Sequence, residues 1–275
     1  MEWSRVKTIL ILAMLGVNLL LLGNLMNTIW HDRRIERQAL ADAVAICEKQ
    51  GVSVSEGAVG LSTSYPVYAE ERDYTKEEAA ARTILGEKVV RTAAGGGIVT
   101  YVSDTGSASF RNGGYVELRC THTAMPESAH DAARAAGALL RRARLAPEDA
   151  VYTAREEAGA YIVEVAQRMD KKPVYNMALT VTFSDGSAQV DGRLMAGGLK
   201  VTADHAKAPY EALLAFVSEA KKAESEAKRI IRVEQGYFAS IATGGSVLYV
   251  PLWRVETDAG VYHFDLVKGQ LVTVE

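Results

Sequence analysis

The chain has 275 residues, of which 48% are hydrophobic and 24% are charged, a composition typical of a globular body with a membrane segment added. Its formal net charge is −3, and since Arg5 and Lys7 outweigh Glu2 in residues 1–30, the remainder carries −4. A mildly acidic body does not favour a nucleic-acid partner, which needs a basic surface, and two cysteines are too few for a disulfide-rich secreted module.

An uncharged run from Ile9 to Ile29 is the first predicted element. At about 1.5 Å per helical residue it spans roughly 30 Å, the thickness of the hydrocarbon core of a bilayer. Trp3 and Trp30 flank it, and amphipathic rings prefer the headgroup level, so both are predicted membrane-interface anchors. A cleaved signal peptide would have a shorter apolar region followed by a small-residue cleavage site, which this run lacks. We therefore predict an uncleaved transmembrane helix.

Small and polar residues recur within this helix at spacings of three and four, which places them on one face. Small side chains let a second helix approach closely, and an asparagine can form a hydrogen bond across the contact. The alternative is a passive anchor with incidental glycines, and the residues alone leave both open. Basic residues flank the run on both sides, so charge does not decide which side of the membrane holds the body. The predicted contact with a partner helix consists of Ala13, Gly16, Leu20, Gly23 and Asn27.

The remaining residues predict an α+β body, because a helix followed by antiparallel strands recurs three times. Helices are expected over 31–50, continuing the anchor as a stalk, and over 75–85, 127–145 and 210–222. Strands are expected over 52–59, 97–103, 107–111, 115–121, 160–168, 174–183, 188–195, 230–241, 247–256, 261–267 and 270–274. The predicted divisions are the anchor (1–30), the stalk helix (31–50), a first α+β unit (51–125) and a second α+β region (126–275, with sub-units 126–205 and 206–275).

Local signals refine some of these elements. Thr75 followed by Glu78 resembles a capping box at the start of a helix that Gly86 closes, whereas residues 66–73 are expected to be irregular. Cys47 and Cys120 fit one disulfide or two buried thiols, and two buried thiols are expected. Hairpin turns are expected at 104–106, 112–114 and 184–186, where Gly or Asn tolerates positive φ.

Motifs that carry chemistry are missing from the sequence. The histidines and cysteines lack zinc-site spacing, and neither a nucleophile elbow nor a Walker loop occurs. Two S-x-x-K matches are attributed to chance, and the glycine runs are read as flexible connectors. Neighbouring acids such as Glu70-Glu71 and Glu77-Glu78 are expected on the solvated surface. No catalytic, cofactor-binding or metal residue is predicted, and the chain is expected not to be an enzyme.

Both chain ends resemble the YycI-type membrane-anchored regulators. The opening residues 1–9, with Asn18 midway along the apolar run, are similar to the start of that group. Near the other end, residues 235–237, 250–255 and 258–262 are similar to the carboxyl end of the YycI and YycH group, in which a P-x-W-R strand is followed by a turn and another strand. The resemblance covers residues 1–30 and 230–275, while the middle matches only in length and order of elements.

This resemblance implies a non-enzymatic regulator with a cytoplasmic N-terminus and an extracytoplasmic body. The implied partners are the sensor histidine kinase of a two-component system that controls cell-wall metabolism and a sister YycH-like regulator. Contacts among transmembrane helices would form part of the control, and no cofactor is implied. The competing hypothesis is an extracytoplasmic module that binds a cell-wall fragment or a protease and is tethered by a passive anchor. That module would have a concave pocket, and an anchored hydrolase would add a cluster of polar groups within it.

Overall fold

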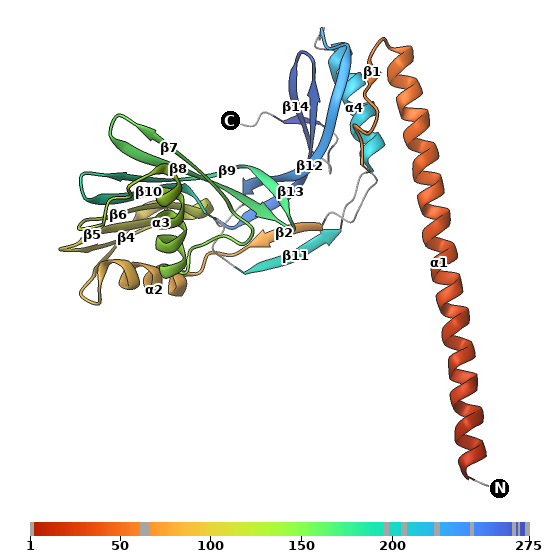
Figure 1. Cartoon of the computed structure of the whole chain (residues 1–275), viewed down its shortest axis with the longest axis horizontal. Coiled ribbons are helices and arrows are strands. Elements are labelled where there is room, and N and C mark those ends of the chain that lie inside the picture. Colours follow the sequence, from red (N-terminus) through yellow and green to blue (C-terminus); the bar gives the residue numbers. More distant parts are fainter. Residues whose placement is uncertain are drawn as a thin grey trace.

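The computed structural model describes residues 3–60, 66–194, 198–204, 208–222, 226–242, 245–265, 268 and 270–272. It is a mixed α+β structure in which one long helix precedes a curled, mainly antiparallel sheet (Figure 1). The predicted fold class is confirmed. The helix, α1 (Trp3–Lys49), runs unbroken through both the apolar run and the predicted stalk.

The body consists of two lobes. The distal lobe contains α2 (Tyr74–Leu85), α3 (Ala129–Arg142) and an antiparallel sheet of eight strands. The order of these strands across the sheet is β3-β4-β5-β6-β10-β9-β8-β7. Their bounds are β3 (Val90–Ala94), β4 (Ile98–Ser103), β5 (Gly106–Arg111), β6 (Tyr115–Cys120), β7 (Val151–Glu157), β8 (Ala160–Met169), β9 (Lys172–Ser184) and β10 (Ser187–Arg193).

The proximal lobe combines segments from both ends of the body with the C-terminal part of α1. Its helix is α4 (Pro209–Lys222), and its central strands are the paired β12 and β13. The N-terminal strand β2 pairs with β13, so the chain returns to this lobe after building the distal one. The strands are β1 (Ser53–Val54), β2 (Pro66–Glu70), β11 (Leu199–Asp204), β12 (Arg229–Ile241), β13 (Val247–Thr257), β14 (Gly260–Asp265) and β15 (Leu271–Val272).

Each lobe has its own hydrophobic core. In the distal lobe the predicted apolar stripe of α3 is buried, and its alanines Ala132 and Ala136 are fully covered. In the proximal lobe, Ala43 and Cys47 of α1 pack in one cluster with Leu213 and Phe216 of α4. Both cysteines are free and buried, as expected.

The lobes join where β9 meets β12. Val174 pairs with Tyr237 in parallel, and the Asn176 side chain extends this pairing. Its amide nitrogen donates to the Ala239 carbonyl oxygen (2.8 Å), and its oxygen accepts from the Ala239 N–H (2.7 Å). The predicted boundary between residues 125 and 126 falls inside the distal lobe, because β6 pairs with β10. The independence of the predicted units stays a prediction.

Two local predictions are wrong. Residues 66–70 are not irregular but form β2, which has pairing partners on both sides, β13 and β11. Pro66 is its first residue, a position that tolerates proline. The cap of α2 is Asp73 rather than Thr75: its carboxylate accepts from the N–H groups of Thr75 (3.0 Å) and Lys76 (3.1 Å).

Candidate functional site

The apolar part of α1 is exposed along its whole described length. Among the described residues, α1 is one helix long and apolar enough to cross a membrane, and the body buries none of its apolar stretch. In Figure 1 the N-terminal half of α1 stands clear of both lobes. Trp30 is 70% exposed, whereas the side chain of Trp3 lies outside the described part of the structure.

The predicted partner-helix residues share one open face of α1, which we call the small-residue face (Ala13, Gly16, Leu20, Gly23 and Asn27). All five are exposed, and Leu20 is 72% exposed. A Cβ atom added at Gly16 or Gly23 would meet no atom within 4 Å. Nothing within the described chain therefore occupies this face.

The small-residue face points away from the body. Ala43 and Cys47 are the most buried residues with which α1 docks onto the proximal lobe. Leu20 and Cys47 lie about seven and a half helical turns apart, as do Gly16 and Ala43, because an α-helix has about 3.6 residues per turn. The half turn places the two sets on opposite sides of α1, so a second membrane helix can approach without meeting the body.

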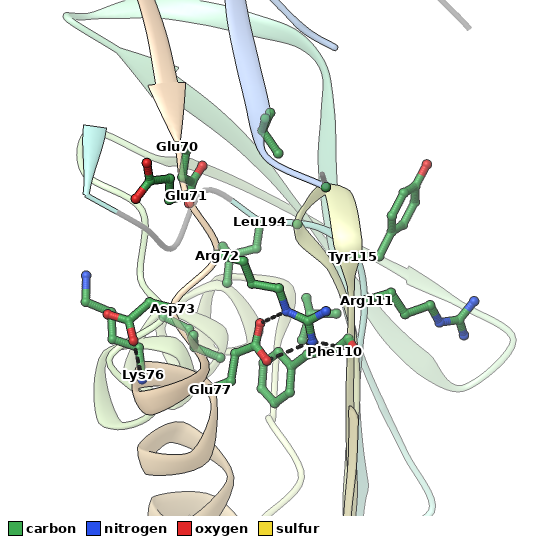
Figure 2. A pocket seen from close by; sticks show the side chains of 15 residues that line it. Glu70, Glu71, Arg72, Asp73, Lys76, Glu77, Phe110, Arg111, Tyr115 and Leu194 are labelled. Atoms are coloured by element: carbon green, nitrogen blue, oxygen red, sulfur yellow. Dashed lines mark hydrogen bonds and ion pairs between the residues drawn. The ribbon is translucent and has the colours of Figure 1, made fainter. Parts of the chain in front are cut away.

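A pocket between the lobes is the second candidate site (Figure 2). It lies where β2 leads into α2 beside β6 and β13, and the space in it that water-sized molecules can reach is about 50 Å³. Its apolar wall comes from Phe110, Val116, Leu145, Leu194 and Val247.

Two acids at this pocket correct the sequence-based expectation that they lie on the solvated surface. Glu70 is 6% exposed and Glu77 is 9% exposed. Their neighbours follow the expectation better: Glu71 forms an exposed ion pair with Lys200 (3.0 Å), and Glu78 is 41% exposed at its side chain. One acid of each pair is buried and the other is exposed, because successive residues point in different directions.

Arg72 lies at the centre of the pocket and ties the segment after β2 to the distal lobe. Its guanidinium binds both carboxylate oxygens of Glu77, at 2.6 Å from Nε and 2.9 Å from Nη2. It also donates to the Phe110 carbonyl oxygen (3.0 Å), to Asn112 Oδ1 (2.9 Å) and to the Gly97 carbonyl oxygen. Figure 2 shows it between Glu77 and Phe110, with Arg111 pointing away. The cation at the centre of the pocket is thus engaged by protein groups.

Glu70 is engaged in the same way. It accepts a hydrogen bond from the buried hydroxyl of Tyr249 on β13. Burial and the nearby Glu70 charge raise the pKa of Tyr249 above its ordinary value, which favours the neutral phenol as donor. The charges that line the pocket therefore hold β2, α2 and the distal sheet together. Within the described residues, no group of three or more His, Cys, Asp or Glu side chains is arranged to hold a metal ion.

Sequence reasoning missed this pocket because its lining comes from distant segments. The only local signal was the charged run 70–73 that ends in the α2 cap, and such a run does not reveal which acids are covered by β13 or β5. The small-residue face, in contrast, belongs to one helix and follows from residue spacing alone.

Comparisons with known proteins give similarity in structure only. No protein-family model matches the chain, and no curated protein does. The chain is similar to the crystal structure of an uncharacterized protein from Eubacterium rectale ATCC 33656 (13% identity, TM-score 0.49, covering 82% of this chain and 90% of that chain). It is also similar to the Bacillus megaterium YpeB C-terminal domain (12% identity, TM-score 0.36, covering 75% and 98%). Neither similarity supports the YycI-type resemblance specifically, which stays a prediction.

Proposed function

We propose that this chain is a non-enzymatic, membrane-anchored regulator of the sensor histidine kinase of a cell-wall-controlling two-component system. It acts through contacts of α1 and the body with the kinase and with a sister YycH-like regulator. The N-terminus lies in the cytoplasm and the body outside the membrane. The support for this proposal is the resemblance of the two chain ends, together with the exposed apolar half of α1.

The observation that carries the proposal is that the small-residue face points away from the docked body. A partner helix on that face would contact glycine backbone closely, and Asn27 would supply a hydrogen bond in the apolar medium. Binding of such a helix shifts the equilibrium between the two states of the kinase. The size of the shift is set by the difference between its affinities for those two states. Because both proteins share one membrane, contacts made by the body add to those of the helix through effective concentration.

The test adds bulk to the small-residue face of the full-length protein. Gly16→Leu combined with Gly23→Leu keeps the segment apolar, so insertion is retained, but it prevents close helix approach. Association with the kinase, measured by in-membrane cysteine crosslinking or a membrane two-hybrid assay, should fall severalfold.

The matched control is Leu22→Phe, which adds bulk on the opposite side of α1. It should leave association at the wild-type level. Unchanged association in the double glycine variant, at equal membrane content, would remove the small-residue face from the mechanism.

The pocket between the lobes favours one alternative, an extracytoplasmic binding module on a passive tether. That module would bind a cell-wall fragment or a protease through the body alone. A foreign anchor would then leave function intact, and soluble cell-wall fragments would raise the thermal stability of the protein by mass action.

A further inference from the structure

The body does not sit on the end of α1 but extends back alongside it. In Figure 1 the C-terminal end of α1 lies beside α4. From there the proximal lobe extends down the view, so that β11 lies level with the middle of α1. The strand order runs from β12 through β13 and β2 to β11, so β11 is the edge of the sheet. The underside of the body, formed by β11 and, farther from α1, by α2, is therefore near the level where the apolar run of α1 ends (Figure 1).

The length of α1 between the apolar run and the proximal lobe is short enough to place this underside at the membrane surface. Leu40 packs against the proximal core, and Trp30 marks the end of the apolar run. The ten residue steps from Trp30 to Leu40 span about 15 Å of helix. The headgroup layer occupies roughly 5–8 Å of this on one side of the bilayer. The body thus attaches close above the headgroups and extends back toward them.

Helix tilt changes the depth of β11 less than that of the distal lobe. Transmembrane helices tilt by about 20° on average, and such a tilt moves the far end of the distal lobe most. In Figure 1 β11 is much closer to α1 than are α2 or β5, so tilt displaces it least.

The surface of β11 is suited to lipid. Among the described strands it pairs with β2 alone, so its outer edge presents backbone N–H and C=O groups. Val201 is 63% exposed and Leu199 is 39% exposed, and both project from the same face of the strand. Backbone donors beside exposed aliphatic side chains fit an interface of phosphate groups and acyl chains.

We propose that the β11 edge rests on phospholipid headgroups of the bilayer that α1 crosses. This second contact fixes the orientation of the body relative to the membrane, and hence the face that it presents to a membrane-bound partner. The inference rests on the membrane anchoring included in the proposed function.

Spin labels on the full-length protein test the contact. In a Cys47→Ala, Cys120→Ala background, single cysteines replace Val201, Val261 or Leu20, and the labelled proteins are placed in phosphatidylcholine/phosphatidylglycerol nanodiscs without any other protein. Val261 on β14 is the matched control, because Figure 1 places β14 far from the N-terminal half of α1 and Val261 is only 44% exposed. Collision rates with a water-soluble nickel chelate and with oxygen report the depth of each label.

The label at 201 should collide with the nickel chelate severalfold less often than the label at 261, although position 201 is the more exposed in the protein itself. The label at 20 should show the high oxygen accessibility of the hydrocarbon core. Aqueous accessibility at 201 with hydrocarbon accessibility at 20 would overturn the β11 contact alone. Aqueous accessibility at 20 would overturn the anchoring and the inference with it. A label at Leu199 repeats the test should the Val201 variant fold poorly.

Discussion

Replacing Glu77 by glutamine should destabilise the body far more than the same change at the neighbouring Glu78. The Arg72 and Glu77 side chains are each 11% exposed, and two short contacts join them. Removing one partner of a buried ion pair leaves the other charge uncompensated, which costs about 3–5 kcal/mol. For a domain of this size, each kcal/mol lowers Tm by about 2–4 °C, so Glu77→Gln should lower Tm by about 6–20 °C.

The control is Glu78→Gln in the same turn of α2. Glu78 binds Arg82 at 2.8 Å, but both side chains are about two-fifths exposed. An exposed pair at this spacing contributes about 0.3–0.5 kcal/mol, so Tm should fall by about 2 °C or less. Thermal unfolding of the detergent-solubilised protein, followed by circular dichroism, measures both variants.

A double variant separates ion pairing from packing. Arg72→Met with Glu77→Leu removes both charges together, so its loss of stability should be smaller than the sum of the losses in the two single variants. A loss below about 1 kcal/mol in Glu77→Gln would match an exposed pair and would refute the buried ion pair described at the start of α2.

Three further changes probe other parts of the fold. Gly192→Ala should cost about 2–3 kcal/mol, because φ is +134° and the added Cβ would collide with the Ala178 carbonyl oxygen. The free energy of unfolding should fall as pH drops below 6.5, because burial and Arg254 lower the pKa of His263 and the unfolded chain binds that proton more readily. It should also fall as pH rises above 10, because burial and a neighbouring carboxylate raise the pKa of Tyr249.

Matched variants check each of these. Gly95→Ala, with open space at its Cβ, should change stability by less than about 0.5 kcal/mol. His263→Gln should flatten the acid dependence, and Tyr249→Phe should make the alkaline loss shallower. Equal effects of the two glycine changes, or pH profiles identical to wild type, would contradict the packing described for these residues.

The elements that could be predicted are those specified by neighbouring residues. The turn at Ser184-Asp185-Gly186 joins β9 and β10 as expected, with positive φ at Asp185 and Gly186. The long helix and the apolar stripe of α3 follow from local spacing in the same way. These features depend on residues a few positions apart, so a single sequence is enough to indicate them.

The elements that were missed depend on distant partners. β2 begins with a proline and ends in a glutamate, and it becomes a strand only because β13 and β11, far along the chain, pair with it. The strands β3, β7 and β11 were also not predicted, and each of them lies at a sheet edge. The expectation of three sequential units likewise omitted the return of the chain, in which β2 joins strands from the C-terminal third.

The candidate sites also divide into features set by neighbouring residues and features set by distant ones. The small-residue face could be predicted from spacing within one helix, whereas its direction relative to the body could not, because it depends on which side of α1 docks onto α4. The burial of Glu70 depends on Tyr249, which lies 179 residues away. A pattern of neighbouring acids cannot reveal such a contact.

The central claim is that α1 takes part in signalling rather than only holding the body at the membrane. Exchange of residues 1–30 for an unrelated apolar anchor, with expression of the kinase's target genes as the readout, tests it most directly. The same anchor carrying the grafted small-residue face serves as the control. We predict that the foreign anchor gives the output of a deletion strain and that the graft restores it. Wild-type output from the foreign anchor, at equal protein level, would contradict the account.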